Sequence, residues 1–350
     1  MSFMYVNTRN LLGHTTGVQR YTKKIIEYIS TAGVRVELIH PDNIIYGMKG
    51  HMWEQLSLPR KVTSKDILWS PSNTGPLLIK KQIVTIHDTV PFDHPEWLNK
   101  KFVAWYQFMQ PRLAKKVEHI ITISEFSKER IMHHLRVPES KVSVIYNGVD
   151  VLQPGAGGRA AEKGAPVVEG DYLLSVGSLE PRKNIPRLIK AFLRFKQESG
   201  SDIRLVIVGK KGVSRVFGDD GADALTDNDA VIFTGHVSDD ALVSLYQHAR
   251  GFCYPSMYEG FGLPPLEAMC YGLPVLTSNT TSLKELCEQR AILVDPLSVS
   301  SIAEGIHQLV TGQGPADMQK KGEAFAQSLT WKQCASETLR VLEHGSQRVA

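Results

Sequence analysis

Short apolar segments rich in β-branched residues alternate with segments of helical periodicity along the whole chain, and this alternation limits the fold most strongly. Apolar strands separated by helices are typical of parallel sheets covered on both faces. We expect twelve strands, at residues 3–6, 34–39, 67–69, 83–87, 119–124 and 142–146, and then at residues 172–176, 204–208, 230–234, 251–254, 274–277 and 291–294. Six strands in each half predict an α/β fold with two doubly wound domains.

A segment of linker composition separates the two halves. Residues 153–170 contain five glycines and two prolines and show no apolar periodicity. We therefore predict one domain at residues 1–152 and a second at residues 171–330. Residues 331–350 have a helical pattern, and the sequence leaves open whether this helix packs back on the first domain.

Charge is divided unevenly between the halves. The 350 residues include 40 Lys and Arg against 36 Asp and Glu, but residues 1–150 hold 20 basic and 13 acidic side chains. This local surplus is too small for a typical nucleic-acid-binding protein. The chain shows no apolar run of the ~20 residues that span a membrane and no signal peptide, and its four cysteines lack metal or disulfide spacing. We expect a cytoplasmic protein.

Two carboxylates eight residues apart enclose a glycine- and proline-rich loop. Glu259 follows the expected strand 251–254, and Glu267 lies about one turn inside the next helix. The glycines between them allow close backbone approach to a ligand, and the free N–H groups of a helix start suit a diphosphate. The loop therefore predicts a nucleotide-sugar site; the alternative is a plain helix start where Glu267 offsets the dipole.

A second strand end carries two adjacent cations. Arg182 and Lys183 follow Gly177 at the exit of the expected strand 172–176 and precede a helix. Arginine can bind phosphate oxygens through two donors and lysine as a point charge. The pair predicts neutralisation of a diphosphate leaving group; a solvated basic turn is the alternative.

Two loops in the first half carry weaker signals. Gly13 lies in a short glycine loop without the dinucleotide fingerprint, so a phosphate or sugar contact and a plain turn both fit it. His87 and Asp88 end the expected strand 83–87, at the edge where α/β folds bind ligands. The alternative is that this pair caps the following turn.

A basic, aromatic-rich segment spans residues 99–117. Its basic residues are interspersed with large apolar ones: Lys100, Lys101, Arg112, Lys115 and Lys116 with Phe102, Trp105, Tyr106, Phe108 and Met109. Such a helix can lie on an anionic membrane surface. We predict peripheral membrane contact here; a core helix with a solvated rim is the alternative.

Taken together, these motifs resemble the retaining glycosyltransferases of family GT4, over nearly the whole chain. EGFGLPPLEAM is similar to the family's E-x7-E motif and SVGSLEPRKN to its diphosphate-binding strand exit, while SEFSKERI and VIYNGVD are similar to signatures near the domain boundary. The resemblance implies the GT-B fold, in which two Rossmann-like domains face a central cleft.

The resemblance also implies roles for the charged residues. Arg182 and Lys183 would bind the donor diphosphate and stabilise its departure. Glu259 would hold hydroxyl groups of the sugar and Glu267 those of the ribose. Ser178 stands where the family often has arginine, so one phosphate contact is missing or comes from Arg182.

Further roles follow for the loops. The backbone of residues Phe261, Gly262 and Leu263 would meet the phosphates, and Gly177 belongs to the donor-binding strand exit. Gly13 would lie beneath the diphosphate, His87 near the donor sugar, and Asp88 toward the acceptor.

No metal site is predicted. Residues 227–229 have the Asp-x-Asp form that holds a divalent ion in some glycosyltransferases, but they precede an expected strand, where a turn is the better interpretation. His133 and His134 lie in a helical pattern without an evident carboxylate partner, which indicates a surface position.

These features predict a metal-independent retaining hexosyltransferase without a cofactor, with GDP-mannose as donor. The acceptor would be a glycan or a polyprenyl-diphosphate-linked sugar in surface polysaccharide synthesis such as that of O-antigen, at the inner face of the cytoplasmic membrane. A UDP- or dTDP-sugar donor, a GT-B epimerase or phosphorylase, and a non-catalytic nucleotide-sugar-binding scaffold are the alternatives.

Overall fold

The structure, a computed structural model, describes residues 4–12, 16–45, 47–63, 66–150, 168–209 and 228–347. The chain divides into two compact units. The first comprises Met1–Gly148 and Leu329–Ala350, and the second Val149–Ser328. Most of the predicted linker, residues 153–167, lies outside the described residues.

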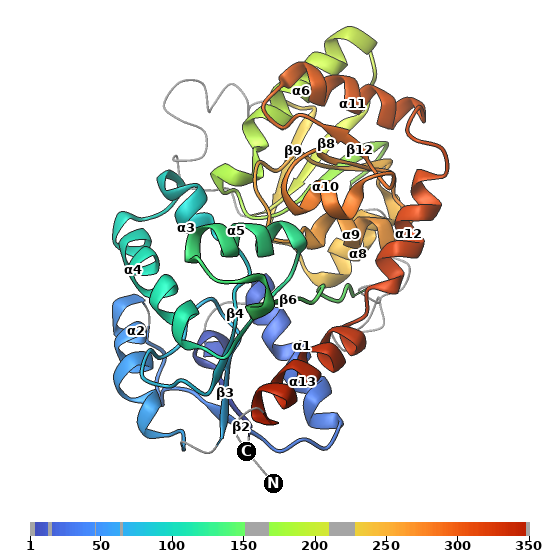
Figure 1. The fold of residues 1–350 in the computed structure, drawn as a ribbon. Coiled ribbons are helices and arrows are strands. Elements are labelled where there is room, and N and C mark those ends of the chain that lie inside the picture. Colours follow the sequence, from blue (N-terminus) through green and yellow to red (C-terminus); the bar gives the residue numbers. More distant parts are fainter. Residues whose placement is uncertain are drawn as a thin grey trace. The chain divides into compact units, whose positions relative to one another are not determined.

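The first unit contains a parallel six-stranded sheet in the order β2-β1-β3-β4-β5-β6 (Figure 1). Its strands are β1 (Met4–Asn7), β2 (Val36–Ile39), β3 (Ile67–Ser70), β4 (Gln82–Thr85), β5 (His119–Thr122) and β6 (Val142–Val144). Its helices are α1 (Gly17–Thr31), α2 (Gly47–Leu56), α3 (Val90–Asp93), α4 (Lys100–Lys116), α5 (Glu125–Leu135) and α13 (Trp331–Gln347).

Helices cover both faces of this sheet. On one face α1 and α13 lie side by side (Figure 1). A core that includes Tyr21, Ile25, Trp69 and Trp331 joins them to the strands. A Cβ on Gly148 would lie 2.2 Å from the Trp331 nitrogen, so glycine is needed where the chain passes the start of α13. Helices α4 and α5 pack over β4, β5 and β6 in a separate core.

The second unit contains a parallel six-stranded sheet in the order β12-β11-β10-β7-β8-β9. Its strands are β7 (Tyr172–Val176), β8 (Arg204–Val208), β9 (Val231–Gly235), β10 (Gly251–Tyr254), β11 (Val275–Ser278) and β12 (Ile292–Val294). Its helices are α6 (Ile185–Ser199), α8 (Asp239–His248), α9 (Leu263–Cys270), α10 (Thr281–Cys287), α11 (Val299–Thr311) and α12 (Met318–Ser328).

The second unit is also layered. Apolar residues of α6 at helical spacing, among them Leu188 and Phe192, pack with α11 against the strands. Helices α9 and α12 form another packed pair. Each sheet is thus built from alternating strands and helices, as the apolar pattern predicts.

All twelve expected strands are present, and the predicted fold class is confirmed. The largest difference that affects a site concerns β4, which ends at Thr85. His87 and Asp88 therefore lie in the segment that leads from β4 into α3 and are not part of the strand.

Candidate active site

The carboxyl ends of β7 and β10 define the candidate active site in the second unit. The chain runs from β7 through β8 to β9 on one side of the sheet and then crosses to β10 on the other, so the strand order reverses between β7 and β10. Open α/β sheets bind ligands at such a switch point. The segments that follow these two strands contain the two predicted donor motifs.

A buried ion cluster connects the two segments. The Glu259 carboxylate accepts hydrogen bonds from Arg182 Nη1 at 2.8 Å and from Lys183 Nζ at 2.6 Å. Lys183 is 8% exposed and Glu259 6%. Since an unpaired buried charge is costly, each of these groups depends on the others. Residues predicted from separate motifs therefore form one cluster.

Two neutral side chains also hold the Glu259 carboxylate. Tyr254 Oη donates to its Oε1 at 3.0 Å and Ser256 Oγ at 2.7 Å. Burial opposes ionisation, but the charges of Lys183 and Arg182 and the hydrogen bonds from Lys183 and Ser256 lower the pKa of Glu259 to about 2. Glu259 is therefore ionised at neutral pH and acts as an acceptor of hydrogen bonds, not as a proton donor.

Arg182 lies between two carboxylates. Its Nε donates at 2.6 Å to Glu180, which also accepts a 2.8 Å hydrogen bond from Ser178 Oγ. The side chain of Glu180 is 50% exposed, whereas that of Glu259 is 8% exposed. Ser178, where an arginine was expected from the family, thus positions a partner of Arg182.

Hydrogen bonds between loops fix the backbone of the cluster. Asn184, in the left-handed conformation at the start of α6, donates to the Pro255 carbonyl at 2.9 Å. Ser282 Oγ lies 2.9 Å from the Glu259 carbonyl oxygen and 2.8 Å from that of Phe261. The candidate site is therefore preorganised by buried hydrogen bonds.

Sequence reasoning missed three of these supporting residues. Tyr254 ends β10 and Ser256 follows it, so both lie within five residues of Glu259 in the sequence. This closeness in sequence could have indicated that they contact the Glu259 carboxylate. Ser282 lies in α10, beyond β11, and no local pattern connects it to the Glu259 loop.

Gly262 determines how α9 begins. Its φ of 110° disfavours other residues, and a Cβ there would lie 2.6 Å from Leu283 Cδ2. Pro264 and Pro265 have no N–H group, so in this first turn the backbone donors are those of Gly262 and Leu263. These N–H groups belong to the segment 261–263 predicted to meet phosphates.

Glu267 lies apart from the ion cluster, inside α9. It is buried, and Tyr246 Oη donates to its Oε2 at 3.4 Å. These contacts do not test its predicted interaction with the ribose, which stays a prediction.

The remaining predicted site residues belong to the first unit. His87 is buried, with Nε2 2.8 Å from the Pro71 carbonyl oxygen and its ring at 4.9 Å from that of Tyr21. Asp88 is half-buried and accepts a hydrogen bond from the Val90 N–H at 3.3 Å. Gly13 lies outside the described residues.

Burial lowers the pKa of His87 to about 4. An unfolded histidine titrates near pH 6.5, so between these values the unfolded chain binds more protons and the free energy of unfolding falls as the pH falls. We expect His87 to account for a loss of about 2 kcal/mol between about pH 7.5 and about pH 5. Urea unfolding of wild type and His87→Gln measures this difference, and an equal pH dependence in the two would contradict it.

One expectation about histidines is wrong. His134 does not lack a carboxylate partner, because its Nε2 lies 2.9 Å from Asp93 Oδ1 beside Arg130. Asp93 is on α3 and His134 on α5, so the pair is distant in sequence. Across the described ranges, no group of three or more His, Cys, Asp or Glu side chains is placed to hold a metal ion.

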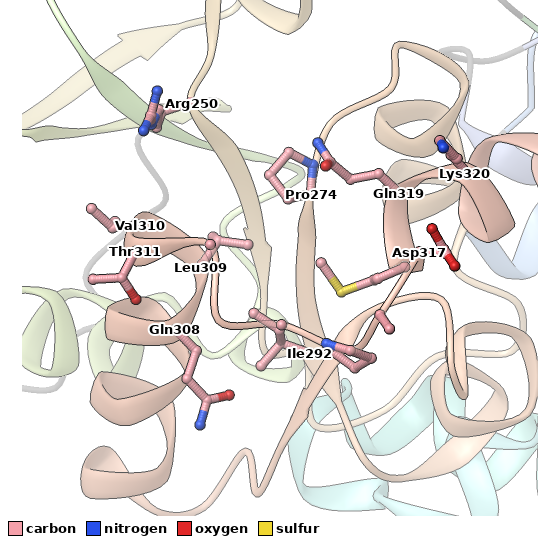
Figure 2. A pocket seen from close by; sticks show the side chains of 15 residues that line it. Arg250, Pro274, Ile292, Gln308, Leu309, Val310, Thr311, Asp317, Gln319 and Lys320 are labelled. Carbon is pink, nitrogen blue, oxygen red and sulfur yellow. The ribbon is translucent and has the colours of Figure 1, made fainter.

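A pocket lies at the other edge of the second sheet. It has a volume of about 540 Å³, and Arg250, Pro274 and Ile292 line it near the amino ends of β10, β11 and β12 (Figure 2). It therefore shares no residue with the ion cluster at the carboxyl edge. We assign the candidate site to the cluster, because the two predicted donor motifs meet there and Lys183 and Glu259 are buried charges.

Comparison with known proteins identifies the family. The model for the group 1 glycosyl transferases matches residues 159–326, and that for glycosyltransferase family 4 matches residues 66–152. The O-antigen chain mannosyltransferase RfbU of Salmonella typhimurium is 32% identical over 264 residues, which are 73% of this chain and 69% of that protein. The chain belongs to the group 1 glycosyl transferases. It is therefore an enzyme, a glycosyltransferase.

A second curated relative and two solved structures are also similar to this glycosyltransferase. The O-antigen chain mannosyltransferase B of Escherichia coli is 29% identical over 289 residues, 79% of this chain and 74% of the relative. Among solved structures, WaaG, a glycosyltransferase involved in lipopolysaccharide biosynthesis, has a TM-score of 0.72 at 16% identity over 97% of this chain and 99% of its own. The sucrose-phosphate synthase of Thermosynechococcus elongatus has a TM-score of 0.75 at 17% identity, with 98% and 99% coverage. These structures show the GT-B fold.

Proposed function

We propose that this glycosyltransferase transfers mannose from GDP-mannose to a glycan or polyprenyl-diphosphate-linked acceptor during surface polysaccharide synthesis, with retention at the anomeric carbon. The cluster of half-buried Arg182 with buried Lys183 and Glu259, where the strand order reverses between β7 and β10, carries the catalytic part of this proposal. The choice of mannose and of O-antigen synthesis rests on the two relatives named as O-antigen chain mannosyltransferases.

In the proposed reaction, the bond between the mannose C1 and the phosphate oxygen breaks and GDP departs. The acceptor hydroxyl oxygen attacks C1 from the face of the leaving group, and its proton passes to the departing phosphate. Lys183 and Arg182 stabilise the charge that develops on that phosphate. Ionised Glu259 accepts hydrogen bonds from sugar hydroxyls.

The different exposure of the two carboxylates that contact Arg182 indicates how the diphosphate would bind. Glu180 is the more exposed partner, while Glu259 is held by Lys183, Tyr254 and Ser256 as well. Replacing the exposed Glu180 contact with a phosphate oxygen requires little reorganisation, whereas moving Glu259 would leave Lys183 buried without its partner. We infer that phosphate takes the place of Glu180 at the guanidinium.

A panel of nucleotide sugars tests the donor. Released nucleoside diphosphate is measured with GDP-mannose, UDP-glucose, UDP-N-acetylhexosamine and dTDP-rhamnose. We expect turnover with GDP-mannose. Preferred turnover of another sugar would refute the donor assignment, and conversion of a donor without transfer would favour an epimerase.

Metal independence is a separate part of the proposal. Because two side-chain cations are positioned to neutralise the leaving group, we expect the same rate of GDP release with and without EDTA. Loss of activity in EDTA and its recovery with magnesium would contradict this expectation.

We also propose that the first unit binds the anionic inner face of the cytoplasmic membrane through residues 99–117. Of the apolar side chains in this segment, Phe102 and Phe108 are exposed, whereas Tyr106 and Met109 are buried and Trp105 is half-buried. The neighbouring helix α2 adds exposed Met48, Met52 and Leu56 at four-residue spacing, and the ring of its His51 lies 5.3 Å from that of Trp105. No helix within the described residues is long and apolar enough to cross a bilayer.

Vesicle sedimentation tests this membrane contact. Binding to vesicles with anionic lipid should weaken as salt rises and in the variant Lys115→Glu/Lys116→Glu, because surface charge attracts these lysines. The matched variant Lys320→Glu/Lys321→Glu, on α12 of the second unit, should bind as wild type does. Equal sedimentation of all three proteins would disprove the contact.

A further inference from the structure

A buried carboxylate in the first unit belongs to none of the groups described above. Glu54 on α2 is fully buried. Its Oε1 accepts hydrogen bonds from Asn7 Nδ2 at 2.7 Å and from Thr74 Oγ1 at 3.0 Å, and it lies 3.7 Å from Arg9 Nε. His51 Nδ1 lies 3.8 Å from its Oε2. Burial raises the pKa of Glu54, but His51, Arg9 and Asn7 together hold it below its usual range.

Arg9 is the part of this group that reaches the surface. Its side chain is 15% exposed, against 0% for Glu54. Gly50 makes room for the guanidinium beside α2, since a Cβ there would lie 2.7 Å from Arg9 Nη1. Among the described residues, the Nη2 group donates to Thr74 at 3.3 Å and Nε has no hydrogen-bond partner. Thr74 and Glu54 therefore hold the guanidinium in place; its buried Nε faces Glu54, so a ligand would meet the terminal Nη groups.

The group lies at the carboxyl edge of the first sheet. Asn7 ends β1, and Thr74 follows its neighbour β3. The strand order reverses between β1 and β3, which is the ligand-binding position in such a sheet. Burial raises the pKa of the nearby Tyr106 phenol, and the charge of Glu54 raises it further while that of Arg9 lowers it.

A fully buried carboxylate is a costly way to stabilise a fold, because desolvation offsets much of the attraction to its partner. Buried charged groups at ligand-binding edges therefore indicate function. Arg182 has a half-exposed partner, Glu180, that a phosphate can replace, whereas the Glu54 partner of Arg9 is fully buried and stays in place. Arg9 therefore offers directed N–H donors with little net charge. Such a pair suits the hydroxyl groups of a sugar.

We propose that Arg9 binds a hydroxyl group of the acceptor sugar and that Glu54 is a positioning residue that fixes its guanidinium. This assignment rests on the proposed glycosyl transfer and adds an acceptor-binding residue to the donor cluster. Thr74 and Asn7 complete the arrangement by holding the Glu54 carboxylate.

The variant Arg9→Lys tests the assignment, because it keeps the positive charge and removes the planar set of donors. With GDP-mannose as donor and 4-nitrophenyl α-mannoside as acceptor, we expect the acceptor KM to rise about tenfold or more. The Kd for GDP-mannose and its slow hydrolysis without acceptor should stay as in wild type. Arg60→Lys, on the surface of the same unit, is the matched control.

A second variant covers the case that Arg9→Lys fails to fold. Arg9→Met/Glu54→Gln removes both charges together, so no unpaired charge stays buried, and it should show the same rise in acceptor KM. An unchanged acceptor KM in a folded variant, or an equal change in the donor Kd, would overturn the assignment. If wild type uses another donor in the panel, the GDP-mannose assignment fails. The acceptor KM and the donor Kd of the Arg9 variants are then compared with those of wild type using that donor.

Discussion

The variant Lys183→Ala is expected to transfer sugar at least ~100-fold more slowly than wild type, measured as kcat/KM for release of nucleoside diphosphate. In the proposed reaction Lys183 stabilises the leaving phosphate, and losing such a contact typically lowers rates by this factor. Lys183 is also the closest cation to buried Glu259, at 2.6 Å. The variant should therefore lose about 3–5 kcal/mol of stability in the second unit.

These two effects can be separated. The double variant Lys183→Met/Glu259→Gln contains no unpaired charge, so its Tm should recover toward that of wild type while transfer stays low. Recovery of transfer together with Tm would show that Lys183 has a structural role only. Near-normal transfer in Lys183→Ala itself would refute the donor-site assignment.

Replacing Glu259 with Ala should also lower transfer at least ~100-fold, since hydrogen bonds from sugar hydroxyls to an ionised carboxylate would be lost. Glu259→Gln is the more informative change, because it keeps the side-chain volume and removes the charge. We expect Glu259→Gln to lower kcat more than it raises the KM for the donor.

The matched control for Glu259 is Glu180→Ala. Both carboxylates contact Arg182, but Glu180 is half-exposed and is the partner that phosphate would replace. Exposed ion pairs contribute little to stability, and we expect transfer within about threefold of wild type. Equal losses in the Glu180 and Glu259 variants would mean that the site depends on the orientation of Arg182 and not on a contact between Glu259 and the sugar.

The fold could be predicted almost completely from the sequence, because burial of parallel strands on both faces leaves a continuous apolar pattern. The clearest error, at residues 83–87, has a physical cause. Apolar Ile86 and the buried His87 continue the pattern beyond the last ladder position at Thr85. The Ile86 N–H still donates to the Ile121 carbonyl at 2.9 Å, but the His87 N–H donates to the Asn73 side chain at 2.6 Å and so leaves the sheet. Both residues are buried, and the sequence shows only burial.

The site could be predicted only in its local parts. The motifs around Arg182 and Glu259 were recognisable, but their pairing spans 77 residues and depends on β7 and β10 being neighbours. The sequence therefore indicated two adjacent cations but not their partner, whereas the structure places both against Glu259. The link between Asn7 and Glu54, 47 residues apart, has no local signal at all.

Metal-independent transfer of mannose with retention is tested most directly by proton NMR of the reaction. Wild-type enzyme, GDP-mannose and 4-nitrophenyl α-mannoside are incubated in EDTA, and the anomeric proton of the newly transferred mannose is observed as it appears. We expect GDP release together with an α-linked product from the first time points. A β-linked product, or no transfer until magnesium is added, would contradict it.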